Sequence, residues 1–294
     1  MADEPSTGSA LELDHITQVF HTRRGEVRAV DDVSLRLGRG EVLCLVGQSG
    51  SGKSTTAKIA SGLLHPTAGD VRFDGYSILS RGRESKKRFK EFRRAVQYVH
   101  QDPYASLNPT QDVFSILSAP LRRHRLVSSR SEAKERVAEL LSQVGLTPPE
   151  TFLPKFPHQM SGGQRQRIAV ARALTVQPRL IIADEATSML DVSIRIGLLS
   201  MLTELRKNLG VGFLYITHDL AMAKYFGREG NIAVMHHGRI VEYGPTLEVI
   251  ANPQDDYTKA LLEAVPEPDP DLARRKREAR LAARAAQQSG VPAA

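Results

Sequence analysis

Residues 44–62 read CLVGQSGSGKSTTAKIASG, an apolar run that leads through a glycine-rich segment into a helical pattern. Residues 47–54 fit the pattern G-x-x-x-x-G-K-[ST] between a predicted strand and a predicted helix, which is typical of a phosphate-binding loop. Glycine lets backbone N–H groups approach phosphate oxygens, and the helix N-terminus adds positive potential. We expect Lys53 to reach the β- and γ-phosphates of a nucleotide and Ser54 to offer its hydroxyl to Mg²⁺. The residues expected to bind the nucleotide here are Gly47, Ser49, Gly50, Ser51, Gly52, Lys53, Ser54 and Thr55.

A second predicted strand ends in two carboxylates. The stretch RLIIADEA at 179–186 places Asp184 and Glu185 directly after an apolar run. Because open α/β sheets bind ligands at the carboxyl ends of their strands, both side chains are expected near the phosphate loop. We expect Asp184 to orient Mg²⁺ through water and Glu185 to polarise an attacking water. Taken alone, such a pair is also typical of a solvated turn.

A histidine follows a third apolar run, GFLYIT at 212–217, in the same manner. An isolated histidine at this place is often structural. Since His218 is expected to share one edge of the sheet with Lys53 and Glu185, a contact with the γ-phosphate is the preferred interpretation.

The stretch MSGGQRQRIAVARAL at 160–174 contains a second candidate anion site. Ser161, Gly162 and Gly163 open a predicted helix, whose first N–H groups lack intrahelical partners and favour negative charge. If one chain has two phosphate sites, both could bind the same nucleotide, or each could bind a different nucleotide molecule. The residues alone leave both arrangements open.

The order of apolar patterns predicts an α/β fold. The short continuous runs at 41–47, 180–184 and 212–217 indicate strands buried on both faces of a parallel sheet. Alternating patterns and glycine-rich turns between 11 and 75 predict a small antiparallel sheet beside it. The charged stretch at 81–96 is a helix or a loop, and a mainly helical, more polar block continues to about 160.

Composition narrows the class of protein. The 294 residues are 41% hydrophobic, and no run reaches the ~18 apolar residues of a membrane-spanning helix. The first ten residues lack the apolar run of a secretory signal. Cys44 is the single cysteine, which excludes an intrachain disulfide and an iron–sulfur cluster. Five of the seven net positive charges fall in residues 274–294, so the basic character belongs to a tail and nucleic acid is not an expected partner.

These motifs, in this order, resemble the ATP-binding-cassette (ABC) ATPases over residues 11–270. Residues 47–54 resemble the Walker A loop, Gln101 the Q-loop, 161–164 the signature, 184–185 the end of Walker B and 188–191 the D-loop. His218 corresponds to the switch histidine, and Phe20 to the aromatic residue that stacks on adenine. By this resemblance the catalytic residues are Lys53, Gln101, Glu185 and His218, and the Mg²⁺ residues are Ser54, Gln101 and Asp184. The further ATP-binding residues are Phe20, Ser161, Gly162, Gly163, Gln164 and Asp191.

The resemblance also implies the architecture. It is a P-loop NTPase fold of the ABC ATPase type, with a RecA-like parallel core, an antiparallel β subdomain and an inserted helical subdomain at about 86–160. A disordered tail at 1–10 would precede the ATP-binding domain at 11–251, and a C-terminal extension with the basic tail would occupy 252–294. Two such domains meet head to tail, so that the Walker A loop of one and the signature of the other enclose each ATP.

Two stretches, at 101–109 and 252–270, are similar to the ATPase subunits of oligopeptide and dipeptide importers. That branch implies a homologous but different partner ATPase, two transmembrane permease subunits and an extracytoplasmic binding protein, with this chain at the cytoplasmic face of the membrane. Nickel and oligosaccharide importers share these segments. Met160, Ala186 and Met189 depart from the usual motif residues, but none of the three replaces a charged catalytic group.

Other classes fit less well. DNA-repair ABC proteins separate Walker A and signature by long coiled coils, whereas Lys53 and Ser161 are 108 residues apart. Translation-type members carry two cassettes in one chain. Glu185 and His218 argue against a non-catalytic nucleotide sensor, and multidrug or lipoprotein exporters lack the segment after 252.

Overall fold

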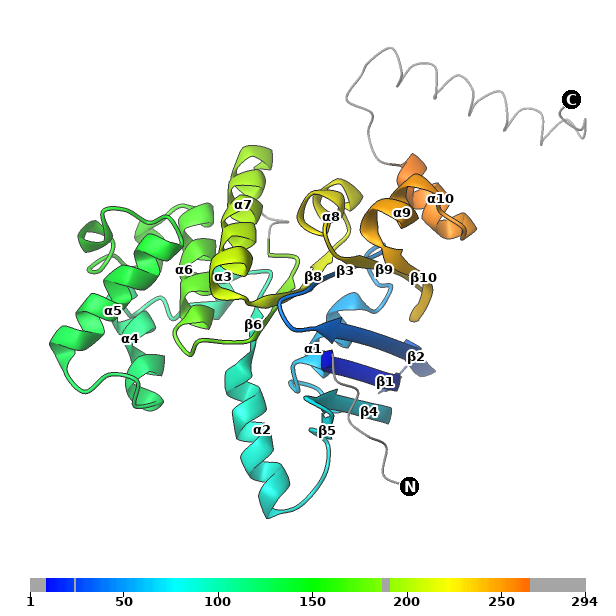
Figure 1. The fold of residues 1–294 in the computed structure, drawn as a ribbon, viewed down its shortest axis with the longest axis horizontal. Helices are drawn as coiled ribbons and strands as arrows, with labels where there is room; N and C mark the ends of the chain where they lie inside the picture. Colours follow the sequence, from blue (N-terminus) through cyan, green and yellow to red (C-terminus); the bar gives the residue numbers. More distant parts are fainter. Residues whose placement is uncertain (1–8, 24, 187–190, 265–294) are drawn as a thin grey trace, which may run out of the picture.

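The computed structural model describes residues 9–23, 25–186 and 191–264. These residues form a six-stranded sheet in the order β10-β9-β3-β8-β7-β6, drawn across the middle of Figure 1. The strands are β3 (Val42–Val46), β6 (Val96–Val99), β7 (Leu180–Asp184), β8 (Gly212–Thr217), β9 (Asn231–His236) and β10 (Arg239–Pro245). All neighbouring pairs are parallel except β9 and β10. Every residue of β3, β7 and β8 is buried, which confirms that the three apolar runs are central strands.

A second, antiparallel sheet has the order β2-β1-β4-β5. Its strands are β1 (Ser9–Thr22), β2 (Gly25–Gly38), β4 (Ala68–Phe73) and β5 (Tyr76–Ser77). Its inward side chains, such as Leu13 and Val33, share one apolar cluster with Leu45 of β3, Ile216 of β8 and Ile59. Full burial of each such side chain contributes roughly 1.5–3 kcal/mol. Ile59 belongs to α1 (Lys53–Ala60), so the cluster holds this helix between the two sheets.

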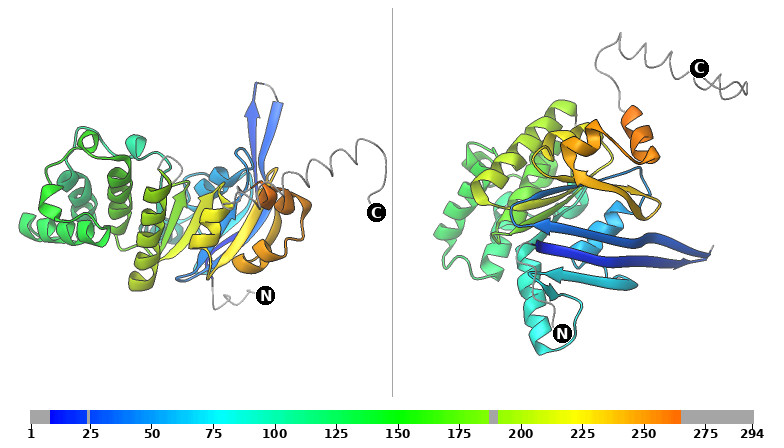
Figure 2. Two further views of the ribbon diagram at one scale, coloured as in Figure 1. Left: turned by 90° about the horizontal axis from the view of Figure 1, so that it is seen from above. Right: turned by 45° about the vertical axis from the view of Figure 1, so that its right-hand side comes forward.

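Helices pack at the far edge of the parallel sheet, at the left in Figure 1 and in the left view of Figure 2. They are α3 (Pro103–Ser106), α4 (Val113–Arg123), α5 (Arg130–Gln143) and α6 (Gly162–Leu174), with the 3₁₀ turns η1 (Pro149–Thr151) and η2 (Pro157–Gln159). Leu117, Leu140 and Ile168, from three of these helices, are buried in one core cluster. Closer to the sheet lie α7 (Val192–Leu209) and α8 (Leu220–Phe226). The helix α7 packs on α6 and α8, and α8 packs on β3 and β8.

Two boundaries differ from those predicted. The helical block expected at about 86–160 is interrupted by β6, which pairs in parallel with β7 and belongs to the core sheet. The charged stretch before it forms α2 (Arg83–Ala95), and β6 follows with no intervening turn residue to signal it. At the N-terminus, β1 begins at Ser9, because Ser9 pairs with Gly38 of β2. Residues 9 and 10 therefore belong to the domain, and the rest of the predicted tail lies outside the described residues.

The chain returns along the other edge of the sheet. After β10 come α9 (Thr246–Ala251) and α10 (Asp256–Glu263), drawn in orange in Figure 1. The predicted extension from 252 is thus described as far as residue 264, and the predicted basic tail lies outside the described part. Among the described residues, no helix combines the length and apolar character that crossing a bilayer requires.

Candidate active site

The glycine-rich loop joins β3 to α1, as the pattern predicts. Gly47 has φ 155° and Gly52 has φ 109°, values that favour glycine. A Cβ at Gly47 would lie 2.2 Å from the carbonyl oxygen of Met235, and one at Gly52 would lie 2.2 Å from that of Ala29. The loop therefore sits directly against β9 and β2, and its shape depends on both glycines. Since the first N–H groups of α1 have no intrahelical partner, the loop and helix tip together offer donors to an anion.

Lys53 is buried at the centre of this loop, with 4% of its surface exposed. Its Nζ donates to the carbonyl oxygens of Gly47 and Gln48, each at 2.8 Å. Burial lowers the pKa of Lys53, and the negative charges of Glu185 and Asp184 oppose that shift. The ammonium group is therefore held close to the two carboxylates that the sequence places at the end of β7.

Asp184 is tied to two other elements. Its Oδ1 accepts a hydrogen bond from Ser54 Oγ at 3.0 Å, and its Oδ2 accepts one from Tyr98 of β6 at 2.6 Å. Burial raises the pKa of Tyr98, and the adjacent negative charge of Asp184 raises it further, so the phenol remains a donor. Sequence reasoning missed Tyr98; the only available signal was one hydroxyl in the apolar run before Gln101.

Glu185 lies between Gln101 and His218. Its Oε2 accepts a hydrogen bond from Gln101 Nε2 at 3.0 Å, and its Oε1 lies 3.4 Å from His218 Nδ1. Glu185 has φ 45°, a left-handed conformation that costs a non-glycine residue about 1–3 kcal/mol. Its own N–H donates to Ile216 O of β8 at 3.0 Å, which fixes this backbone against the neighbouring strand. Three predicted catalytic residues from separate parts of the sequence therefore meet at one point.

The predicted second anion site forms the N-terminus of α6. Ser161 Oγ accepts a hydrogen bond from the N–H of Gln164 at 3.2 Å, and Gln164 Oε1 accepts one from the N–H of Ser161 at 3.0 Å. Gly162 is half-buried, and Gly163 packs so closely on α7 that a Cβ would meet Ile194 at 2.7 Å. This helix belongs to the helical layer, whereas α1 lies between the sheets (Figure 1). The two candidate anion sites thus stand on different parts of the chain.

The other predicted binding residues lie in the loop, on α1, on the β1–β2 hairpin and just before α7. Ser49 is exposed and Thr55 is half-buried on α1. Phe20 lies on the β1–β2 hairpin, which projects upward in the left view of Figure 2, and is 38% exposed. Asp191 is exposed at the position before α7. The rest of the predicted D-loop, 188–190, lies outside the described residues.

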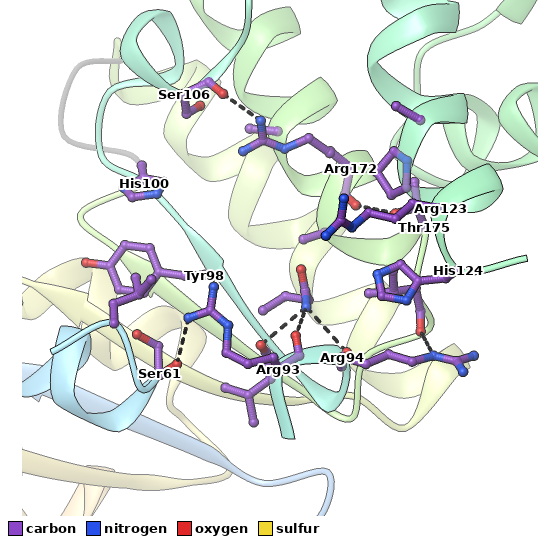
Figure 3. A pocket seen from close by; sticks show the side chains of 18 of the residues that line it. Ser61, Arg93, Arg94, Tyr98, His100, Ser106, Arg123, His124, Arg172 and Thr175 are labelled. Carbon is purple, nitrogen blue, oxygen red and sulfur yellow. Dashed lines mark hydrogen bonds between the residues drawn. The ribbon is translucent and has the colours of Figure 1, made fainter. Parts of the chain in front are cut away.

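A groove of about 1000 Å³ opens where α2 and β6 face the helical layer (Figure 3). Its lining is rich in basic side chains, namely Lys90, Arg93, Arg94, Arg123 and Arg172, with His100 and His124, against Glu91 as the acid among them. Arg93 donates to Ser61 O at 3.5 Å and Arg94 to Val176 O at 3.4 Å. Arg172 donates to Ser106 O at 2.5 Å, so several of these cations are already oriented by the backbone.

These groups suit the hydrolysis of a nucleoside triphosphate. The Lys53 ammonium group lies inside the glycine-rich loop beside the N–H groups that open α1, and the carboxylate of Glu185, with Gln101 and His218 as polar neighbours, follows β7 at the same edge of the sheet. The oxygen atoms of Ser54, Asp184 and Gln101 are the hard ligands that Mg²⁺ prefers. The donor set therefore fits a magnesium-bound nucleotide.

Comparisons with known proteins agree with this chemistry. The family model "ABC transporter" matches residues 30–188, and the model "Oligopeptide/dipeptide transporter, C-terminal region" matches 241–290. The oligopeptide transport ATP-binding protein OppF of Bacillus subtilis is 47% identical over 92% of this chain and 87% of its own length. The glutathione import ATP-binding protein GsiA of Escherichia coli O157:H7 is 46% identical over 86% of this chain, which spans 39% of that longer protein.

Solved structures show the same fold. The dimeric post-hydrolysis structure of the ATP-binding cassette MJ0796, bound to ADP and Pi, has a TM-score of 0.71 at 29% identity and covers 80% of this chain and 98% of its own. The cbiO1 protein of Clostridium perfringens, part of the ABC transporter complex cbiONQ, has a TM-score of 0.69 at 28% identity and covers 83% and 92%.

Proposed function

The chain belongs to the ABC transporter family of ATPases, and from that premise we propose that it is the ATP-hydrolysing subunit of an importer for oligopeptides or dipeptides. The observation that carries the proposal is the meeting of Lys53, Glu185 and His218 around one phosphate-binding loop, followed by the segment that matches the C-terminal region of peptide transporters. An oligosaccharide or nickel importer is the second candidate, since those systems use similar segments.

The site residues take the following roles in this proposal. The loop amides and Lys53 bind the β- and γ-phosphates of ATP, and the ring of Phe20 stacks on adenine. Ser54, Asp184 and Gln101 hold Mg²⁺, which when bound neutralises charge on the phosphate oxygens. Glu185 accepts a proton from the attacking water, Gln101 and His218 orient that carboxylate, and His218 also contacts the γ-phosphate.

A second ATPase chain completes the site. The helix tip at Ser161, Gly162, Gly163 and Gln164 and the exposed Asp191 stand on a different part of the chain from the Walker A loop. We infer that they serve the nucleotide bound by a homologous but different partner chain. Because the γ-phosphate then contacts both subunits, its removal by hydrolysis weakens their association, and ATP acts as a switch between closed and open dimers.

The basic groove is the proposed docking surface for the two permease subunits, at the cytoplasmic face of the membrane. Its cations favour a loop or short helix that carries acidic residues. Specificity for the transported molecule would then reside in the permeases and in an extracytoplasmic binding protein.

Charge reversal in the groove tests this docking. Arg123→Glu is expected to reduce co-purification with the permease subunits roughly tenfold, since a charged hydrogen bond contributes about 1.5–3 kcal/mol. The neighbouring Arg122 lies on the same helix and outside the groove lining, so Arg122→Glu is the matched control. ATP binding by the isolated chain should be unaffected in both variants. Equal co-purification of the two variants would place the permease contact elsewhere.

Transport itself is tested in the assembled complex. The chain, its partner ATPase and the two permeases are reconstituted in proteoliposomes with the binding protein. Addition of short peptides is expected to stimulate ATP hydrolysis, and oligosaccharides or Ni²⁺ are the controls. Stimulation by sugars or Ni²⁺ alone would reject peptides as the substrate class while keeping the ATPase role.

A further inference from the structure

The helix α10 reaches back to the nucleotide loop through one side chain. The hydroxyl of Tyr257 accepts a hydrogen bond from the backbone N–H of Gln48 at 3.0 Å, although 209 residues separate the two along the chain. Tyr257 lies within the segment 241–290 that matches the C-terminal region of peptide transporters. The contact therefore joins this segment directly to the Walker A loop.

The peptide group involved is one that Lys53 also holds. The N–H of Gln48 and the carbonyl of Gly47 belong to the same planar peptide unit. Lys53 Nζ donates to that carbonyl at 2.8 Å, and Tyr257 accepts from the N–H at 3.0 Å. The two side chains thus grip opposite edges of a single peptide and fix its orientation at the entrance of the loop.

Tyr257 is itself held in place by its neighbours. Its ring stacks on His236 of β9, with centroids 3.7 Å apart and planes inclined by 8°. The turn before α10 is fixed independently, because Glu242 accepts hydrogen bonds from the N–H groups of Gln254 at 2.8 Å and Asp255 at 3.2 Å. The helix also packs on the core through Leu261 and Leu262. Loss of the hydroxyl alone should therefore leave α10 docked.

We propose that Tyr257 is a positioning residue for ATP binding, which presets the peptide between Gly47 and Gln48 so that the loop is ordered before the nucleotide arrives. The inference rests on the assignment of residues 47–54 as the nucleotide site. It deepens that assignment by giving a role in ATP affinity to the segment that distinguishes this branch of the family. Preorganisation of this kind improves affinity because less conformational freedom is lost on binding.

The test separates the hydroxyl from the ring. Tyr257→Phe keeps the stacking on His236 and removes the acceptor, and it should weaken ATP binding by the full chain roughly threefold to tenfold. In the assembled complex the KM for ATP should rise while kcat stays unchanged, since the contact acts on binding and not on the chemical step. Tyr243→Phe, at an exposed tyrosine of β10, is the matched control and should bind ATP like the wild type.

A second variant and the melting temperature complete the design. His236→Leu keeps the hydroxyl but removes the stacked ring, and it should also weaken ATP binding. An unchanged dissociation constant in Tyr257→Phe overturns the inference, and so does a loss of affinity that is matched by a lower melting temperature of the nucleotide-free chain. A wild-type chain that binds no ATP would instead refute the proposed function, so the two failures are distinguishable.

Discussion

Glu185→Gln is expected to reduce ATP turnover by about 10²–10⁴-fold while ATP binding remains. Glutamine has the same shape and can keep a hydrogen bond to Gln101, but it cannot accept the proton of an attacking water. General-base catalysis contributes typically 10²–10⁴-fold, so kcat should fall by about that factor. Because the γ-phosphate then stays in place, the variant should accumulate as a closed dimer with its partner ATPase.

The measurement combines phosphate release with size-exclusion chromatography in the presence of ATP. Glu248 is an exposed acid on α9, far along the chain from β7, and Glu248→Gln is the control that should hydrolyse ATP normally. Undiminished phosphate release by Glu185→Gln would remove Glu185 from the role of general base.

Lys53→Met is expected to produce the second large effect, a loss of ATP binding itself. Methionine fills much of the same buried space but offers no donor. The variant therefore lacks the hydrogen bonds from residue 53 to the carbonyl oxygens of Gly47 and Gln48, and it lacks the positive charge expected to face the phosphates. A charge-assisted hydrogen bond contributes about 1.5–3 kcal/mol. Because the ammonium group is expected to bond both the β- and the γ-phosphate, the dissociation constant for ATP should rise at least about 100-fold.

Equilibrium binding of a fluorescent ATP analogue to the full chain measures this. Lys58 lies in the last turn of the same helix and is exposed, so Lys58→Met is the matched control and should bind ATP normally. Retained affinity in Lys53→Met would show that the phosphates bind away from this loop.

Sequence could predict the parts of the fold that are determined by the pattern of residues within one short stretch of chain. Continuous apolar runs identify β3, β7 and β8, since a strand buried on both faces needs no polar residues. The glycines of the loop are needed for the close approach of backbone N–H groups to phosphate, and the acids after β7 stand where α/β sheets bind ligands. These features account for the positions of Lys53 and Glu185.

The missed features depend on contacts between distant parts of the chain. The strand β6 follows α2 without a turn, and only its pairing with β7 defines it. Tyr98 and Tyr257 resemble any partly buried tyrosine in the sequence, and their roles arise when folding brings them to Asp184 and Gln48. Local patterns carry no information about such partners, so a single sequence could not reveal them.

The reciprocal bonds between Ser161 and Gln164 have a consequence for how readily two chains separate. In both bonds the side-chain oxygen accepts from a backbone N–H, so these bonds do not use the Ser161 hydroxyl hydrogen or the Gln164 amide N–H groups, which can donate to a phosphate of the nucleotide in the proposed partner chain. Separation of the two chains would therefore break contacts to the nucleotide without breaking the bonds that hold the N-terminus of α6 in shape. A helix N-terminus that keeps its shape when the chains part can bind the next nucleotide without refolding, as repeated cycles of opening and closing require.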